Sequence, residues 1–272
     1  MLIRFPKNNN RYYNTHYKYV FDILQYGGNH IEFYNCEYFI VYIDNKRCLF
    51  DYSDFFTMEG YDPKNFDFVF KFHKHRNEEY PDNIIAFSPI SFYEWNKFEN
   101  MNYNFVNNKC ISMRQKSYGN AIKRRDHVRN MLVQRYGNKR VKTRIVDQEL
   151  YFLDIEDNNI AIFVPGAQEN MLDRAQFQYM ALGMPTISPW IPEELPFVSF
   201  VHSVDYILCN NEYTDLINQI ELFLTKPDLL KVIGAAGRLT FRLSSTAIAL
   251  NAWIFKTIKG SKNECNNTNS II

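Results

Sequence analysis

Three loops in the second half of the chain carry residues suited to binding a phosphate-bearing ligand. Arg114 and Lys116 follow one short apolar run, Gly166 and Glu169 follow the next, and Trp190 follows a third. Guanidinium and ammonium groups pair with phosphate oxygens, and a glycine lets the backbone come close to a ligand. Because the carboxyl ends of parallel strands share one edge of a sheet, we expect these loops to form a cationic pocket suited to a diphosphate. The alternative is a solvated basic helix face with ordinary connecting loops.

The net charge of +1 conceals a strongly basic block in the middle of the chain. Residues 112–144 carry eleven basic side chains and one acidic side chain, whereas the segments 1–107 and 145–272 have net charges of −3 and −7. Eleven cations in one segment could bind a nucleic acid, and such binding would weaken steeply with added salt. The block contains only two aromatic residues, Tyr118 and Tyr136, which weakens the case for stacking on single strands.

The composition excludes several other classes of protein. A hydrophobic content of 46% with 17% aromatics is far from that of a disordered chain. The five cysteines include no Cys-x-x-Cys pair, which argues against a zinc ribbon or disulfide scaffold and favours a reducing compartment. No apolar run reaches the roughly 18 residues that a membrane span requires, and the N-terminus lacks the apolar core of a signal peptide. The sequence therefore predicts a cytoplasmic protein.

Three histidines are candidates for a general base. His73 and His75 follow a strongly apolar stretch, residues 66–72, and His16 opens a helix after a polar loop. An imidazole changes its protonation state near neutral pH, which suits proton abstraction from a hydroxyl group. The alternative for each is a structural or merely exposed histidine.

The elements that must position these residues divide the chain into two α/β halves. In the first half we expect a helix over 16–25 and a hairpin turn at Asp44-Asn45-Lys46. The second half alternates strands with helices, which predicts a doubly wound parallel sheet. The expected strands are 1–5, 37–43, 47–51, 66–72, 84–87, 110–113, 140–146, 159–164, 186–188 and 205–208. The expected helices of the second half are 121–136, 148–153, 173–182, 213–224, 229–244 and 246–259.

The change of pattern sets the expected domain boundaries. Residues 1–107 form an N-terminal α/β domain, residues 108–260 form a C-terminal Rossmann-like domain, and residues 261–272 form a polar tail. Gly183 follows the helix at 173–182 and Pro185 comes two residues later, which is a typical helix end.

The stretch from Ile160 to Pro185 resembles the donor-binding half of GT-B glycosyltransferases. In that family a buried strand and loop lead to a helix with the pattern Glu-x-x-Ala-x-Gly-x-Pro. Gln178, Ala181, Gly183 and Pro185 match this pattern at every position except the first. The resemblance covers residues 108–258 and implies two Rossmann-like domains, of which the N-terminal one is small.

The resemblance also implies roles for single residues. The family's helix glutamate holds the ribose of the donor, and Gln178 stands in its place without the charge. Arg174 resembles an arginine near the donor phosphates, and Gly166 would allow close backbone approach. The donor-binding residues implied by the resemblance are Arg114, Lys116, Gly166, Glu169, Arg174 and Gln178.

The expected activity is transfer of a sugar, of the hexosyltransferase class, from a UDP- or GDP-linked donor to a glycan or another acceptor. Such an enzyme needs no metal and no cofactor, because cations and helix dipoles stabilise the leaving diphosphate. The general base would come from His16, His73 or His75. Two alternatives remain: a nucleic-acid-binding module that uses residues 112–144, and a catalytically inactive GT-B relative, which the amide of Gln178 favours.

Overall fold

The computed structural model describes most of the chain as two compact units. The described residues are 2–7, 14–35, 39–53, 55–88, 109–117, 119–144, 158–166, 171–172 and 174–267, without the side chains of 14–16, 174 and 261–267. Unit 1 comprises residues 1–95, 194–198 and 243–272, and unit 2 comprises residues 96–193 and 199–242.

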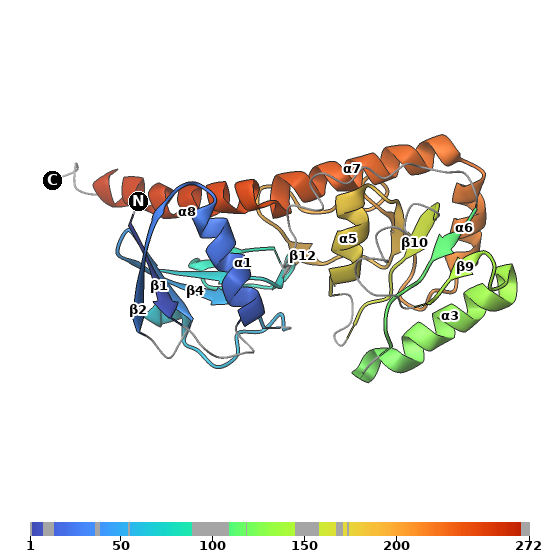
Figure 1. Ribbon diagram of the computed structural model, residues 1–272, viewed down its shortest axis with the longest axis horizontal. Helices are drawn as coiled ribbons and strands as arrows, with labels where there is room; N and C mark the ends of the chain where they lie inside the picture. The colour runs from blue at the N-terminus through green and yellow to red at the C-terminus, as the bar shows by residue number, and fades with distance from the viewer. Residues whose placement is uncertain are drawn as a thin grey trace. The chain divides into compact units, whose positions relative to one another are not determined.

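Unit 1 is built on a six-stranded mixed sheet (Figure 1). The strand order is β2-β1-β3-β4-β5-β7, and β3 alone is antiparallel to its neighbours. The bounds are β1 Leu2–Lys7, β2 His30–Asn35, β3 Ile40–Ile43, β4 Lys46–Asp51, β5 Phe68–Lys71 and β7 Ile84–Ala86. The expected turn joins β3 to β4, and both Asp44 (φ 49°) and Asn45 (φ 66°) adopt the left-handed conformation that a two-residue hairpin needs.

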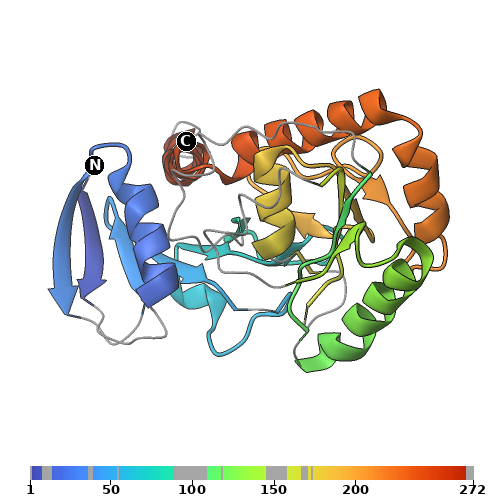
Figure 2. The same cartoon turned by 45° about the vertical axis from the view of Figure 1, so that its right-hand side comes forward.

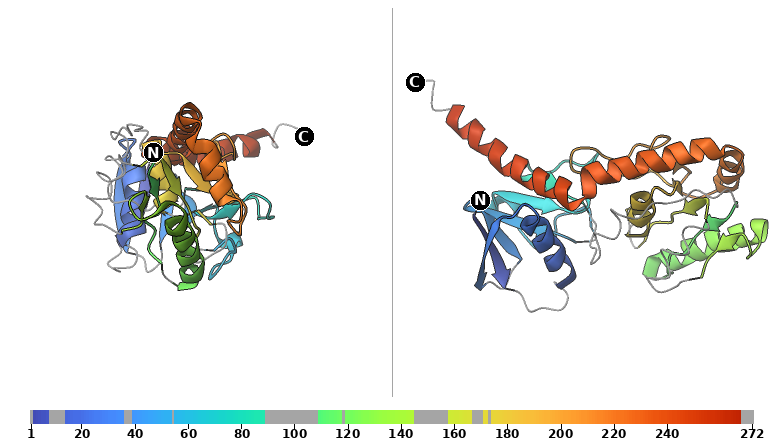
Figure 3. Two further views of the ribbon diagram at one scale, coloured as in Figure 1. Left: turned by 90° about the vertical axis from the view of Figure 1, so that its right-hand side faces the viewer. Right: turned by 45° about the horizontal axis from the view of Figure 1, so that its top comes forward.

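Two helices pack in unit 1. Helix α1 (Asn14–Gln25) buries a stripe of Val20, Ile23 and Leu24, which lie at the spacing of one helix face. Helix α8 (Ala247–Asn267) runs alongside the strands of this unit (Figure 3). Its Asn251 donates to the backbone oxygen of Ile23 at 2.8 Å.

Unit 2 is built on a five-stranded sheet in which every strand is parallel to its neighbours. The strand order is β13-β11-β10-β8-β9, which is a doubly wound topology. The strands are β8 Ile111–Ser112, β9 Val141–Lys142, β10 Ile160–Ile162, β11 Thr186–Ser188 and β13 Ile207–Leu208. The helices are α3 Ile122–Tyr136, α5 Arg174–Leu182, α6 Leu216–Leu224 and α7 Pro227–Ser245.

The two faces of this sheet differ in side-chain size. One face is a continuous apolar core, where alternate strand residues meet Val128 and Leu132 of α3 and Leu216 and Ile220 of α6. The opposite face carries small side chains such as Ser112, whose hydroxyl lies 3.0 Å from that of Tyr179 in α5. Helices α3 and α5 thus lie on opposite sides of the strands (Figure 2).

The close contact between α5 and α7 depends on glycine. Gly183 ends α5 with φ of 82°, which confirms the expected helix end. A Cβ on Gly234 of α7 would lie 2.1 Å from the backbone oxygen of Gly183. A side chain at residue 234 would therefore push the two helices apart.

Most expected elements are confirmed, and the main exceptions are as follows. Strand β2 was not predicted, although His30-Ile31-Glu32-Phe33 alternates polar and apolar residues; it is an edge strand in which no residue is fully buried. Strand β9 is shorter than expected, and the expected helix at 148–153 lies outside the described residues. Helix α8 continues to Asn267, so the residues expected to form a polar tail after residue 260 are helical up to that point.

Unit 1 also includes a segment from the C-terminal end of the chain, beyond the residues 1–107 expected for the N-terminal domain. Residues 243–260 group with unit 1, because α8 packs on α1 and donates hydrogen bonds to Ile23 and, through Trp253, to Ala86. No helix in the described part of the chain is both long and apolar enough to cross a membrane.

Candidate functional site

The parallel sheet of unit 2 has one position where a ligand crevice is expected. From β8 the chain passes to the neighbouring edge strand β9 and then returns to β10 on the other side of β8. The carboxyl ends of β8 and β10 therefore border a topological switch point, where open α/β sheets bind their ligands. The loops that begin at residues 113 and 163 lie at this point, as the sequence predicted.

The structure brings several of the predicted donor-binding residues to this edge. Lys116 is exposed after β8, and Gly166 is buried after β10. Arg114 is only 6% exposed, and its guanidinium donates to the backbone oxygen of Arg144 at 3.1 Å, in the loop after β9. Glu169 lies outside the described residues.

Helix α5 starts at the same edge, directly after the loop from β10. Arg174 is its first residue, and nothing is described of its side chain. Gln178 lies in the second turn and is 6% exposed. The amino end of this nine-residue helix is the positive end of its dipole, which favours an anion.

Two arginines of α3 hold the loops of the crevice in place. Arg125 is 2% exposed and donates twice to the oxygen of Val164, at 3.1 and 3.0 Å, and once to that of Lys116 at 2.6 Å. Arg129 donates to the oxygen of Gln115 at 2.8 Å. These side chains of the basic block therefore bind the backbone of the loops after β8 and β10, which the sequence did not predict.

A buried glutamate on the third loop also supports the crevice. Glu193 has no exposed surface, and its carboxylate accepts a hydrogen bond from the backbone N–H of Leu172, just before α5. The Gln115 side chain likewise accepts from the N–H of Val164 at 2.7 Å. The sequence offered no signal for either residue, because neither contact is local in the chain.

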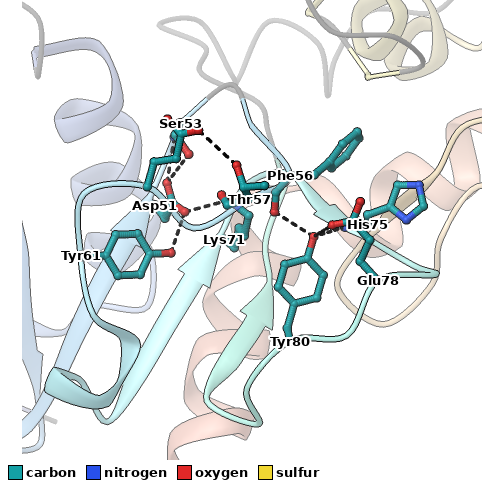
Figure 4. Close-up of polar contacts among 10 residues, drawn as sticks. Asp51, Ser53, Phe56, Thr57, Tyr61, Lys71, His75, Glu78 and Tyr80 are labelled. Carbon is teal, nitrogen blue, oxygen red and sulfur yellow. Dashed lines mark hydrogen bonds and ion pairs between the residues drawn. The ribbon is translucent and has the colours of Figure 1, made fainter.

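Unit 1 places a second group of polar residues at the carboxyl edge of its own sheet (Figure 4). Lys71, at the end of β5, is fully buried and lies 2.8 Å from Asp51, at the end of β4. Asp51 also accepts hydrogen bonds from the hydroxyl groups of Ser53 (2.6 Å) and Tyr61 (2.7 Å). Burial, together with the charge of Asp51 and the hydrogen bond to it, raises the pKa of Tyr61 above its usual value. A lysine inside an apolar strand was the signal in the sequence that could have found this pair.

The predicted histidines of unit 1 lie near the same edge. His73 is 6% exposed and His75 is half-buried, and the ring of Phe56 lies edge-on to both, at 6.5 and 5.0 Å. Nδ1 of His75 accepts a hydrogen bond from the N–H of Asn77 at 3.2 Å.

The third histidine, His16, lies in the first turn of α1, after the loop that follows β1. Its side chain is outside the described residues. In the described ranges there is no group of three His, Cys, Asp or Glu residues that could hold a metal ion. Metal independence and the identity of the base therefore stay predictions.

Together, the fold and these sites define a two-unit α/β protein with parallel strands in each unit and a topological switch point in unit 2. The sequence matches no protein-family model and no curated protein. Among solved structures, the chain is similar to TarM from S. aureus in complex with UDP, with 12% identity and a TM-score of 0.48 over 71% of this chain and 44% of TarM.

Two further solved structures are similar. A glycosyltransferase from Rickettsia africae matches with 11% identity and a TM-score of 0.47, over 93% of this chain and 83% of that one. HepE from Anabaena in complex with UDP matches with 13% identity and a TM-score of 0.41, over 55% of this chain and 40% of HepE. The chain thus spans less than half the length of TarM and HepE.

Proposed function

We propose that the protein is a glycosyltransferase that binds a nucleoside-diphosphate sugar in unit 2. The observation that carries this proposal is the topological switch point between β8 and β10, with the amino end of α5 at the same edge of the sheet. An anionic ligand is favoured there because Lys116 is exposed after β8 and the positive end of the α5 dipole lies at the same edge of the sheet.

The resemblance of residues 160–185 to GT-B enzymes supports a sugar nucleotide as this ligand. Gln178 would bind the ribose hydroxyls through its amide, and Arg174 would pair with the diphosphate. The donor is UDP- or GDP-linked, and the reaction needs no metal because the cations and the α5 dipole stabilise the leaving diphosphate. The acceptor would be a glycan or another hydroxyl compound.

The proposal predicts saturable binding of UDP or GDP to the purified chain, and weaker binding after Arg174→Ala. Loss of one bidentate phosphate contact is expected to raise the Kd at least tenfold, which isothermal titration calorimetry measures. Arg135→Ala is the matched control, because Arg135 is exposed and pairs with Glu221. If neither diphosphate binds the unchanged protein, the proposal fails.

An inactive relative is the second candidate, and the missing carboxylate at residue 178 favours it. Incubation with UDP-glucose and GDP-glucose separates the two, because an active enzyme transfers glucose slowly to water even without its acceptor. Release of free glucose above the background of the Arg174→Ala variant would exclude the inactive relative. Binding of the diphosphate without any release or transfer would favour it.

A further inference from the structure

Helix α7 carries an exposed apolar stripe along the part of the helix that belongs to unit 2 (Figure 1). Leu229, Val232 and Leu239 are 40%, 63% and 57% exposed, and Ala236 between them is half-buried. Their spacing of three and four residues places all four on one face of the helix. The neighbouring face, which includes Ile233, packs into the core of unit 2. A continuous apolar surface of this kind marks a contact with another molecule.

The spacing of the stripe is that of the a and d positions of a coiled coil. Leu229 and Ala236 take a positions, and Val232 and Leu239 take d positions. If two copies of α7 pack side by side in opposite directions, Leu229 faces the partner's Leu239 and Val232 faces the partner's Ala236. A two-fold axis repeats both contacts, so the same stripe serves both subunits.

The border of the stripe carries opposite charges at its two ends. Asp228 lies at the amino end and Arg242 lies near the carboxyl end, on the same side of the stripe, and both are exposed. Asp228 contacts Lys231 of its own helix at 3.4 Å, but its side chain is 94% exposed and so remains accessible to a partner.

These charges favour one partner and one orientation. An antiparallel pair brings Asp228 of each copy opposite the partner's Arg242, whereas a parallel pair would place like charges together. An anionic lipid surface would attract Arg242 but repel Asp228. A second copy of the chain therefore matches the stripe better than a membrane does.

The loop before β13 adds apolar surface beside α7. The hydroxyl of Thr240 donates to the carboxylate of Asp205 at 2.9 Å, so this loop packs directly against the helix. Val201 and Val204 of the same loop are 48% and 53% exposed. A stable homodimer buries at least about 1,200 Å² in total, which requires a surface wider than one helix stripe.

We propose that unit 2 carries a homodimer interface, in which α7 packs antiparallel against α7 of a second copy through Leu229, Val232 and Leu239. The inference goes beyond the proposed transferase function and does not depend on it. None of the three side chains belongs to the edge of the sheet where the donor is expected to bind.

The first test measures the mass of the full chain in solution. Sedimentation equilibrium should show a 32.5 kDa monomer in exchange with a dimer, with a Kd below about 100 μM. Val232→Glu and Leu239→Glu should each raise this Kd about tenfold or more, because they place a carboxylate in an apolar contact. Both side chains are exposed in the single chain, so the circular dichroism spectrum should not change.

Ile122→Glu is the matched control, because Ile122 is a 45% exposed aliphatic residue on another helix of unit 2, α3. Its Kd should stay within about twofold of that of the unchanged protein. A chain that stays monomeric at about 100 μM, or a Val232→Glu variant that dimerises like the unchanged protein, would overturn the proposal.

The second test examines the antiparallel orientation by exchanging charges. Arg242→Glu sets two carboxylates opposite each other at both ends of the stripe, so the Kd should rise about threefold or more. Adding Asp228→Arg to this variant restores opposite charges, and the Kd should return to within about twofold of the original value. A double variant that dimerises no better than Arg242→Glu would contradict the antiparallel packing.

A membrane is the other partner that the test must separate. The chain is mixed with vesicles of phosphatidylcholine and phosphatidylglycerol, and bound protein is measured by flotation. A monomeric chain that binds these vesicles, and loses the binding through Val232→Glu, would show a membrane contact and overturn the dimer. A dimer that ignores the vesicles supports the proposal, and neither result affects the test of the donor site with UDP and GDP.

Discussion

Most arginine side chains of the basic block, residues 112–144, form hydrogen bonds with other residues of the protein. Six of the seven arginines between residues 112 and 144 donate hydrogen bonds to other residues of the chain, and Arg125 is the most buried of them. A buried guanidinium can satisfy several backbone oxygens at once, which no apolar side chain can do. Arg125 thereby connects the loop after β8 to the loop after β10 and fixes the positions of both loops at the switch point of unit 2.

This role predicts a large loss of stability for Arg125→Met. The methionine keeps part of the volume but leaves the oxygens of Val164 and Lys116 without this donor, so we expect the free energy of unfolding to fall by about 3 kcal/mol. Urea denaturation followed by circular dichroism measures this loss. Lys123→Met on the exposed face of α3 should change stability by less than about 0.5 kcal/mol, and equal losses in both variants would contradict the assigned role.

At the scale of elements, the structure explains most of the motif that suggested the family. Gly183 adopts a left-handed conformation at the end of α5, and its backbone packs closely against Gly234 of α7. Pro185 follows two residues later, after the helix has ended. These positions serve helix packing and helix termination. Of the motif residues, Gln178 is therefore the one left for the proposed role in donor binding.

The helix contact predicts opposite effects for two glycine substitutions. Gly234→Ala would place a Cβ 2.1 Å from the oxygen of Gly183, so we expect a loss of about 2 kcal/mol despite the better helix propensity of alanine. Gly260→Ala in α8 has nothing within 4 Å of the new Cβ and should gain up to about 1 kcal/mol. Thermal or urea unfolding of the two variants shows whether each substitution lowers or raises the free energy of unfolding. A Gly234→Ala variant as stable as the unchanged protein would contradict the packing described for α5 and α7.

At the scale of the whole molecule, the charge of the basic block is less available than its sequence suggests. The net charge of the chain is +1, and arginines within the block already bond to backbone oxygens or carboxylates. Nucleic acids bind through free cations that displace counterions from phosphates. The exposed lysines Lys116, Lys123 and Lys139 remain, which suits a small anion better than a polyanion.

We therefore expect only weak nucleic-acid binding. Fluorescence anisotropy with a labelled duplex of about 20 base pairs should show no saturation below about 100 μM protein at about 150 mM salt. A micromolar Kd that weakens steeply with salt would instead support the nucleic-acid-binding alternative.

The sequence by itself determined the class of fold and the order of the elements. Period-two apolar runs and helix-end signals such as Gly183 are local in the chain, so they predicted the strands of both units and the edge where Lys116 and Gly166 lie. Strand β2 was missed, although His30-Ile31-Glu32-Phe33 carries the same period-two pattern.

Only the tertiary structure decided which buried polar side chains form hydrogen bonds and ion pairs with one another or with the backbone. Arg125 with Val164, Glu193 with Leu172 and Lys71 with Asp51 join residues that are 20 or more positions apart. Their charges are stable in the interior only because each one meets a partner there, and those partners are brought by the packing of strands and helices. No local pattern carries that information, so the polar contacts that shape both candidate sites became visible with the fold.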